Sequence, residues 1–232
     1  MSDAAHRRSS ETTPPASSDA AREEIAAASR RVAANGLVIG TGGNLSQRLG
    51  EHFAITATGA VLESLRPEEV SIVDRDGRTA APGPEPSSEL YLHLGIYERY
   101  GAGAVVHTHS PIATALSTVL DEVPLVHYQM LLLGGTIPVA PYHTFGTPEL
   151  AEATVETLEG KTAALMANHG AIVYAHDLDH AVENALLLEW ACTVYWRAAA
   201  LGTLRTISPE EQQKVSEAAA QRSYGATRDA SR

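Results

Sequence analysis

Three of the ten histidines in the 232-residue chain stand where they could bind one metal ion. His107 and His109 lie at the end of an apolar run, residues 104–108, that is typical of a β-strand. Residues i and i+2 of a strand point to the same face, so both imidazoles can reach one ion. His169 lies in the Asn-His-Gly segment 168–170. Three neutral imidazoles with an open coordination position are typical of catalytic zinc, although the spacing alone also fits histidines that pack in a core or face solvent.

A carboxylate and two hydroxyls stand at the expected start of a helix. Ser87 and Ser88 follow a proline-rich loop and precede Glu89. The N–H groups and the dipole of a helix N-terminus favour an anion, and the hydroxyls add donors, so this place could bind a phosphate. Glu89 fits a catalytic carboxylate and, equally, a simple partner of the helix dipole in the first turn. Two small-residue turns, 42–44 and 56–59, offer further donors.

The glycine-rich segments do not fit nucleotide-binding motifs. The segment 40–45 lacks the last glycine of a dinucleotide fingerprint and is not expected to lead into a helix. The Gly-Lys-Thr segment 160–162 is similar to the end of a phosphate-binding loop, but Val155 stands where the first glycine belongs. The only lysines are Lys161 and Lys214, and neither lies in an apolar segment. The sequence therefore disfavours a Schiff-base mechanism and leaves a metal as the electrophile.

Composition argues against a membrane or nucleic-acid partner. Apolar residues make up 44% of the chain, and the net charge is −11 with no basic block. No apolar run approaches the ~20 residues of a membrane helix. The single cysteine, Cys192, excludes a disulfide within the chain and is expected to be a buried thiol. Residues 1–19 are polar and lack the apolar core of a signal peptide, so we expect a disordered leader and a cytoplasmic protein.

Strands and helices are interspersed along the chain. Alternating or continuous apolar runs predict strands at 45–48, 53–58, 71–73, 104–108, 136–139, 163–167 and 171–174. Periodicity and capping residues predict helices at 20–34, from Ser87 or Ser88 to 100, from Pro111, at 148–158 after Thr147, from Asp177 or Asp179 to 201, and at 209–220. Because hairpin-like pairs also occur, we expect a mixed or mainly antiparallel sheet with helices on its faces.

Seven segments in order resemble the class II aldolase/adducin family. They are Gly-Thr-Gly-Gly-Asn-Leu-Ser (40–46), Ile-Thr-Ala-Thr-Gly (55–59), Ser-Ser-Glu (87–89), Val-His-Thr-His-Ser (106–110), Val-His-Tyr (126–128), Ala-Pro-Tyr-His-Thr-Phe-Gly-Thr (140–147) and Asn-His-Gly (168–170). Each segment is weak evidence alone, but the ordered set is specific. Within the family the resemblance is greatest to the bacterial L-fuculose-1-phosphate aldolases, and it covers about residues 20 to 225.

The resemblance implies the fold and the activity. The fold would be a three-layer αβα sandwich around a mainly antiparallel sheet, assembled as a C4 homotetramer with active sites at subunit interfaces. One zinc ion per subunit would support the cleavage of a ketose 1-phosphate, such as L-fuculose 1-phosphate, into dihydroxyacetone phosphate and L-lactaldehyde. The chain would then consist of a leader (1–19), one aldolase domain (20–225) and a flexible tail (226–232).

The resemblance also assigns residues to roles. Three imidazoles would be zinc ligands: His107, His109 and His169. Glu89 would be the catalytic acid/base and could also approach the resting metal. The phosphate-binding positions would be Gly43, Asn44, Thr58, Gly59, Ser87 and Ser88. Tyr128 would reach the site of a neighbouring subunit, and Tyr224 would correspond to a mobile C-terminal tyrosine.

Other activities of the same family remain open. An aldolase for 5-deoxyribulose 1-phosphate or a related salvage sugar would release the same dihydroxyacetone phosphate with a shorter aldehyde. A pentulose 5-phosphate 4-epimerase usually has an aspartate where Glu89 stands, so Glu89 favours an aldolase. A methylthioribulose-phosphate dehydratase and a tetronate-phosphate decarboxylase are further relatives. A non-catalytic, adducin-like module is disfavoured because the three histidines and Glu89 are all present.

Overall fold

The computed structural model of the protein describes residues 18–222, and within them one sheet forms the centre of the molecule. Its eight strands lie in the order β3-β2-β1-β4-β8-β7-β6-β5. The strands are β1 Asn44–Leu49, β2 His52–Thr56, β3 Val70–Val73, β4 Ala104–Thr108, β5 Glu122–Val123, β6 Ile137–Ala140, β7 Ala163–Met166 and β8 Gly170–Ala175. Neighbouring strands are antiparallel except β6 and β7, which are parallel. The prediction of a mainly antiparallel sheet is confirmed.

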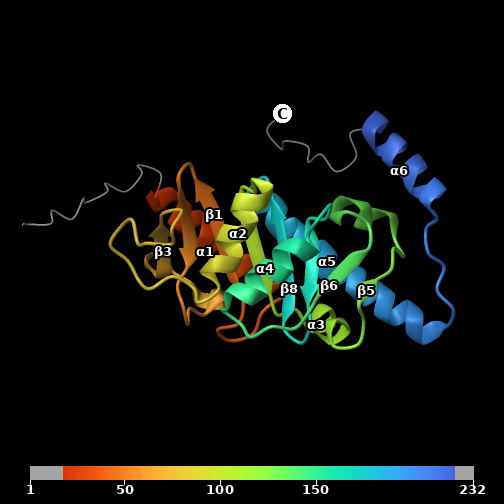
Figure 1. Cartoon of the computed structure of the whole chain (residues 1–232), viewed down its shortest axis with the longest axis horizontal. Coiled ribbons are helices and arrows are strands. Elements are labelled where there is room, and N and C mark those ends of the chain that lie inside the picture. The colour runs from red at the N-terminus through yellow and green to blue at the C-terminus, as the bar shows by residue number, and fades with distance from the viewer. Residues whose placement is uncertain (1–17, 223–232) are drawn as a thin grey trace, which may run out of the picture.

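Helices cover both faces of this sheet (Figure 1). The α-helices are α1 Ser18–Ala34, α2 Leu90–Tyr100, α3 Pro111–Ser117, α4 Pro148–Thr157, α5 Leu178–Leu201 and α6 Pro209–Arg222. Three 3-10 helices are η1 Leu62–Ser64, η2 Pro67–Glu69 and η3 Tyr128–Leu133. Helices α1, α3 and α5 pack on one face, while α2 and α4 pack on each other and on the opposite face. The result is the expected three-layer αβα sandwich.

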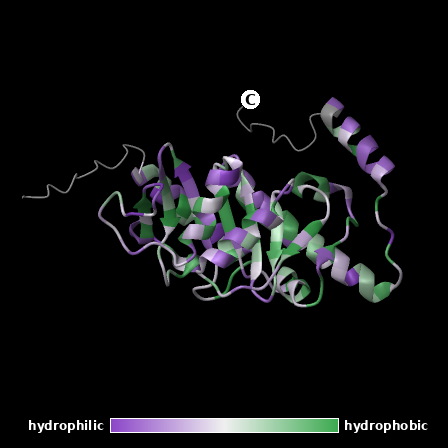
Figure 2. Ribbon diagram, in the orientation of Figure 1, coloured by the Kyte–Doolittle hydropathy of each residue, from purple (hydrophilic) through white to green (hydrophobic). Residues whose placement is uncertain are grey.

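Two hydrophobic cores lie on the two sides of the sheet. The larger core holds the buried faces of α1, α3 and α5, and the smaller one holds those of α2 and α4. Figure 2 shows the apolar residues gathered along the strands and on the inner helix faces. In β4, Ala104 and Val106 enter the larger core, and Val105 enters the smaller one. Period-two alternation therefore turns His107 toward the side of α2 and α4.

Several predicted boundaries are confirmed and others are corrected. Thr147 and Asp177 cap α4 and α5 with their side chains, as expected. The prediction that Ser87 or Ser88 caps α2 is wrong, because Glu89 is the N-cap residue and therefore precedes the first turn. The Ser87 hydroxyl instead accepts a hydrogen bond from the Glu89 N–H at 3.3 Å.

The ends of the chain bear on the predicted domain boundaries. Helix α1 begins at Ser18, two residues before the expected start. Most of the predicted leader, the tail 226–232 and Tyr224 lie outside the described residues, and these predictions stay untested. Within residues 18–222, none of the helices is both long enough and apolar enough to cross a bilayer.

A carboxylate on α5 holds the start of α3. Glu189 accepts hydrogen bonds from the backbone N–H groups of Ile112 and Ala113, each at 2.9 Å. Ser110, the N-cap residue of α3, makes no side-chain capping bond of its own. Glu189 therefore supplies the cap from a distant helix, and it fixes the chain directly after His109.

Replacement of Glu189 by alanine should lower the free energy of unfolding by about 1–3 kcal/mol, because two N–H donors lose their charged partner. Urea denaturation at a fixed protein concentration measures the loss. Glu183→Ala on the same helix is the matched control. Its exposed ion pair with Arg31 should contribute about 0–1 kcal/mol. Equal losses in the two variants would contradict the capping role of Glu189.

Candidate active site

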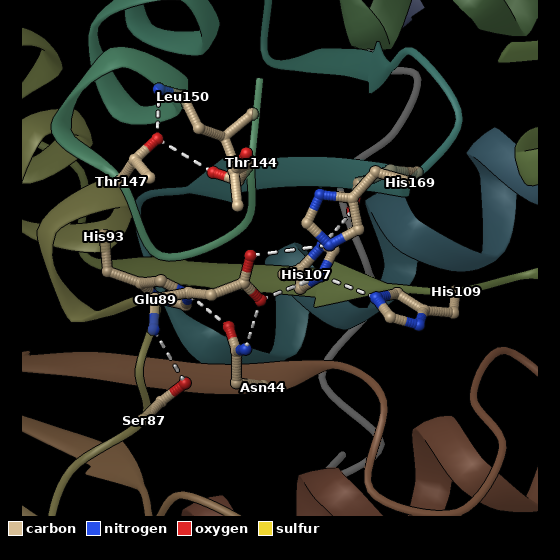
Figure 3. Close-up of polar contacts among 11 residues, drawn as sticks. Asn44, Ser87, Glu89, His93, His107, His109, Thr144, Thr147, Leu150 and His169 are labelled. Atoms are coloured by element: carbon tan, nitrogen blue, oxygen red, sulfur yellow. Dashed lines mark hydrogen bonds and ion pairs between the residues drawn. The ribbon is translucent and has the colours of Figure 1, made fainter. Parts of the chain in front are cut away.

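Three imidazoles from two separate segments converge at one end of the sheet (Figure 3). His107 is on β4, His109 follows two residues later, and His169 lies in the turn between β7 and β8. The Nε2 atoms of His107 and His109 are 3.0 Å apart. The ring of His169 lies 4.8 Å from that of His107 and 5.1 Å from that of His109, centre to centre. The structure thus brings the three predicted ligands together.

Two glycines allow this close approach. A Cβ atom at Gly42 would lie 2.6 Å from Nδ1 of His109. A Cβ atom at Gly170 would lie 2.3 Å from the carbonyl oxygen of Thr108 and 3.1 Å from Cδ2 of His109. Any larger residue would push the histidine-bearing segments apart, so the glycines of both turns serve the geometry of the cluster.

Glu89 completes the cluster from the N-cap position of α2. Its Oε2 atom lies 3.1 Å from Nε2 of His107, and its Oε1 atom lies 3.4 Å from Nε2 of His169. The side-chain amide of Asn44 donates a hydrogen bond to Oε2 at 2.9 Å. Burial alone would raise the pKa of Glu89, but the charge and hydrogen bond of His107, with His169 and Asn44, hold that pKa far below its usual range. The carboxylate is therefore ionised.

Two of the three imidazoles can bind a positive ion without losing a proton. Burial, followed by the charge of His107, lowers the pKa of His109 and the pKa of His169 to about 4, so both rings are neutral near pH 7. Burial would also lower the pKa of His107, but the charge and hydrogen bond of Glu89 raise it above its ordinary value. Nδ1 of His107 lies 2.9 Å from the carbonyl oxygen of Ala171, which directs Nε2 into the cluster.

The donor set fits a divalent metal ion. Two imidazole nitrogens bound to zinc at about 2.0–2.1 Å lie about 3.3 Å apart in tetrahedral geometry, close to the 3.0 Å found here. All three histidines offer ligand atoms within 4.8 Å of one another. Among the described residues, neither Oε1 of Glu89 nor the buried Nδ1 of His169 has a hydrogen-bond partner. Three imidazoles and a carboxylate are ligands that zinc and related ions prefer.

The cluster opens into a pocket of 510 Å³ that also contains the predicted phosphate-binding residues. The pocket is lined by Thr41, Gly42, Gly43, Asn44, Ala57, Thr58, Gly59, Ser87, Ser88, Glu89, His109, Tyr142, His143, Phe145, Asn168 and His169. Three turns distant in sequence, near 43, 58 and 87, therefore meet beside the carboxylate. They offer backbone N–H groups and hydroxyls, which are donors that suit a phosphate.

Some predicted site residues lie elsewhere or act differently. The side chain of Asn44 is committed to Glu89 and His93, so it is not free to bind a phosphate. Tyr128 lies on η3, is 39% exposed and does not line this pocket, so a role in catalysis requires another subunit. Tyr142, His143 and Phe145 also line the pocket, although the sequence analysis assigned them no role and used the segment 140–147 only for the family resemblance.

A second group of ligand-type side chains has a structural explanation. His176, Asp177 and His180 lie within 4.8 Å of one another on the surface. Asp177 caps α5, and its Oδ1 atom accepts hydrogen bonds from the backbone N–H and the ring of His180, each at 2.8 Å. Its Oδ2 atom lies 3.2 Å from Nε2 of His176. Both carboxylate oxygens are thus already used by helix capping and its flanking histidines.

The fold and the site, together with the comparisons that follow, place the chain in a class of metal-dependent lyases. Residues 23–196 match the class II aldolase and adducin N-terminal domain, and the chain belongs to this family. It is 37% identical over 190 residues to the 5-methylthioribulose-1-phosphate/5-deoxyribulose-1-phosphate aldolase of Rhodospirillum rubrum, covering 81% of this chain and 86% of the relative. It is 37% identical over 168 residues to the L-fuculose phosphate aldolase of Escherichia coli, covering 72% and 78%.

Solved structures agree with this family. An L-fuculose 1-phosphate aldolase superposes with a TM-score of 0.83 at 29% identity, covering 90% of this chain and 99% of that protein. A putative aldolase/epimerase/decarboxylase from Escherichia coli superposes with a TM-score of 0.77, also at 29% identity, covering 85% and 98%. The relatives named for their substrates act on sugar phosphates, and the particular sugar differs among them.

Removal of one imidazole should remove the ion. For His107→Ala we expect metal affinity to fall by more than about 100-fold, because a ligand is lost and the Glu89 carboxylate loses its partner. Elemental analysis after dialysis measures the metal content. His143→Ala is the control, because His143 lines the same pocket but lies outside the cluster. Equal metal content in the two variants would exclude the three-histidine site.

Metal affinity should rise with pH. In the metal-free protein the rings of His109 and His169 are neutral near pH 7. Because the pKa of His107 is raised, this ring holds its proton to a higher pH than an ordinary histidine, and a bound ion must displace that proton. Below the pKa of His107, affinity should increase about tenfold per pH unit, and above it the dependence should vanish. Competition with a chromophoric chelator between pH 6 and 8 measures this slope. A slope of two or more protons per ion would contradict the assigned charge states.

Proposed function

We propose that the protein is a zinc-dependent class II aldolase that reversibly cleaves a ketose 1-phosphate into dihydroxyacetone phosphate and an aldehyde. The observation that carries the proposal is an ionised, buried carboxylate, Glu89, in contact with two imidazoles of a three-histidine cluster. Family membership supports the lyase chemistry. The names of the relatives support a sugar phosphate as substrate.

The substrate phosphate would lie in the small-residue turns. Gly43 and Gly59 offer backbone donors, and Thr58, Ser87 and Ser88 add hydroxyls, since the backbone N–H of Thr58 is already bonded to the carbonyl oxygen of Glu85. None of these groups carries a charge, so they would hold a phosphate by hydrogen bonds rather than by an ion pair. With the phosphate there, the carbonyl at C2 and a neighbouring hydroxyl of the sugar would face the three imidazoles.

Glu89 would move the proton at C3. In cleavage the C4 hydroxyl releases its proton to solvent through the group that orients it, and the C3–C4 bond breaks. Glu89, which is ionised at rest, takes up one proton from solvent and delivers it to C3 of the dihydroxyacetone phosphate half, so that no proton is gained or lost overall. In synthesis it removes the same proton. Zinc, when bound by His107, His109 and His169, supplies Lewis acidity that stabilises negative charge beside the carbonyl. Tyr128 of an adjacent subunit in a C4 homotetramer would orient the C4 hydroxyl. A cytoplasmic location stays a prediction.

The aldehyde half distinguishes two substrates. L-fuculose 1-phosphate would release L-lactaldehyde, whereas 5-deoxyribulose 1-phosphate would release acetaldehyde. The second candidate is supported by the Rhodospirillum rubrum relative and by a 5-deoxy-D-ribulose 1-phosphate aldolase of Bacillus thuringiensis, 35% identical over 189 residues, covering 80% of this chain and 89% of the relative. A pentulose 5-phosphate 4-epimerase is less well supported, because Glu89 stands where such enzymes usually have aspartate.

A substrate panel tests the proposal. Zinc-loaded protein is incubated with L-fuculose 1-phosphate, 5-deoxyribulose 1-phosphate and 5-methylthioribulose 1-phosphate, and release of dihydroxyacetone phosphate is followed with a coupled dehydrogenase. Ribulose 5-phosphate serves as the epimerisation control. We expect cleavage of at least one 1-phosphate and no epimerisation. The proposal fails if all three 1-phosphates remain intact or if epimerisation dominates.

The same assay tests Glu89. For Glu89→Gln we expect zinc to be retained and turnover to fall by about 10²- to 10⁴-fold, because general acid–base help is lost. Glu85→Gln is the matched control: it lies on the same loop, is exposed, and does not line the pocket. Turnover by the Glu89 variant equal to that of the control would remove Glu89 from the mechanism.

A further inference from the structure

A chain of buried polar side chains leads from the Glu89 carboxylate into the protein. The carboxylate accepts from Nδ2 of Asn44 at 2.9 Å, and Oδ1 of Asn44 lies 2.5 Å from Nε2 of His93. Nδ1 of His93 lies 2.6 Å from the hydroxyl of Ser46, which lies 2.7 Å from the hydroxyl of Tyr97. All five side chains are buried, and His93 and Ser46 are fully inaccessible. Figure 3 shows the part from Glu89 through Asn44 to His93.

The spacing of these residues shows how two elements build the chain. Glu89, His93 and Tyr97 are four residues apart, so they share one face of α2. Asn44 and Ser46 are two residues apart, so they share one face of β1. The members alternate between helix and strand, and each step of the chain joins α2 to β1. Asn44 also lies directly opposite His107 across the β1–β4 pair, which places its amide beside the metal-binding histidines.

The direction of every hydrogen bond follows from the carboxylate. An ionised carboxylate only accepts, so Asn44 must present its NH₂ group to Glu89 and its oxygen to His93. The flipped amide would set two oxygens against each other at 2.9 Å. Nε2 of His93 must then carry the hydrogen, and Nδ1 of the neutral ring accepts from the Ser46 hydroxyl. The Ser46 oxygen in turn accepts from the Tyr97 hydroxyl. The chain is fully satisfied by one arrangement of protons.

The two oxygens of Glu89 consequently differ. Oε2 is held by the Asn44 amide, whereas Oε1 has no hydrogen-bond partner among the described residues and faces His169 at 3.4 Å. Glu89 is the N-cap residue of α2, yet its side chain makes no capping bond to the helix. Nothing on its own helix fixes the carboxylate, so its orientation depends on His107 and Asn44, which both contact Oε2. When Nε2 of His107 binds a metal ion, it can no longer donate to Oε2, and the Asn44 amide would remain as the hydrogen-bond donor to this oxygen.

We propose that Asn44, His93, Ser46 and Tyr97 form a positioning network that fixes the Glu89 carboxylate through Oε2 and leaves Oε1 to exchange the C3 proton with the substrate. His93 is the central positioning residue, as the Nε2–H tautomer. The inference rests on the proposed acid/base role of Glu89. It adds three positioning residues that do not line the pocket, Ser46, His93 and Tyr97, and it assigns different roles to the two oxygens.

The kinetic test uses His93→Gln and Tyr97→Phe in the zinc-loaded, full-length protein. The readout specific to Glu89 is exchange of the C3 hydrogen of dihydroxyacetone phosphate with D₂O, followed by proton NMR. For His93→Gln we expect exchange and kcat to fall together by about 10- to 100-fold, with KM and zinc content nearly unchanged. For Tyr97→Phe, at the far end, we expect a fall of less than about tenfold. Unchanged exchange per folded, zinc-loaded site in His93→Gln would overturn the network.

A second measurement is independent of the enzyme's activity. In ¹⁵N-histidine-labelled, metal-free wild-type protein, the His93 signals are assigned by their absence from His93→Gln. We expect an unprotonated Nδ1 and a protonated Nε2, and Tyr97→Phe, which keeps the stacking on Phe53, should preserve this tautomer. The Nδ1–H tautomer or a doubly protonated ring would overturn the proposal. If the wild-type protein neither cleaves a ketose 1-phosphate nor exchanges the C3 hydrogen, the proposed function fails, and the tautomer still decides the hydrogen-bond order.

Discussion

The burial of one ionised carboxylate among three imidazoles is the constraint on which the site depends. A buried charge without partners is strongly destabilising, so Glu89 requires a positive or polar group on each oxygen. His107 and the Asn44 amide meet Oε2, and the N-terminal end of α2 adds a favourable dipole at the same residue. Among the described residues, Oε1 faces only His169. A divalent ion held by the three imidazoles would use their lone pairs and supply positive charge beside this oxygen.

The sheet is built so that these groups can meet. Antiparallel pairing places Asn44 opposite His107, and residues that face each other across strands point to the same side. That side is covered by α2, whose first residues carry the carboxylate. The β7–β8 turn adds His169, and Gly170 lets this turn lie against Thr108. The αβα layers thus bring three segments that are distant in sequence to one point. Glu189 also fixes the chain directly after His109, because it caps the start of α3.

Local signals in the sequence predicted much of this arrangement. The His-x-His pair, the Thr147 and Asp177 caps and the strand runs depend on neighbours within a few residues, so pattern reasoning found them. The start of α2 was misplaced because tertiary contacts of Glu89 with His107 and Asn44 decide which residue becomes the N-cap. The hydrogen bonds of the Asn44 side chain to Glu89 and His93 were not predicted, because they too are tertiary contacts. The partners of His93 on β1 were not predicted either, because they depend on strand register, which the sequence does not reveal.

The division of the pocket indicates where substrate choice arises. The turns near 43, 58 and 87, together with the histidines and Glu89, account for a phosphate and the reacting carbons, which a ketose 1-phosphate supplies whatever its aldehyde half. In the proposed reaction, the aldehyde half would contact the remaining lining residues. Tyr142, His143 and Phe145 lie on the loop before α4, and the rings of Tyr142 and Phe145 are largely exposed.

The loop that carries Tyr142, His143 and Phe145 belongs to no strand of the sheet, so it can change its contacts while the metal cluster keeps its geometry. Relatives named for different sugars can therefore share one sheet and one cluster, and discrimination by a few apolar contacts is worth only about 1–3 kcal/mol per methylene. In the proposed reaction, the choice between a methyl and a hydroxyethyl group would therefore depend on loop residues rather than on the fold.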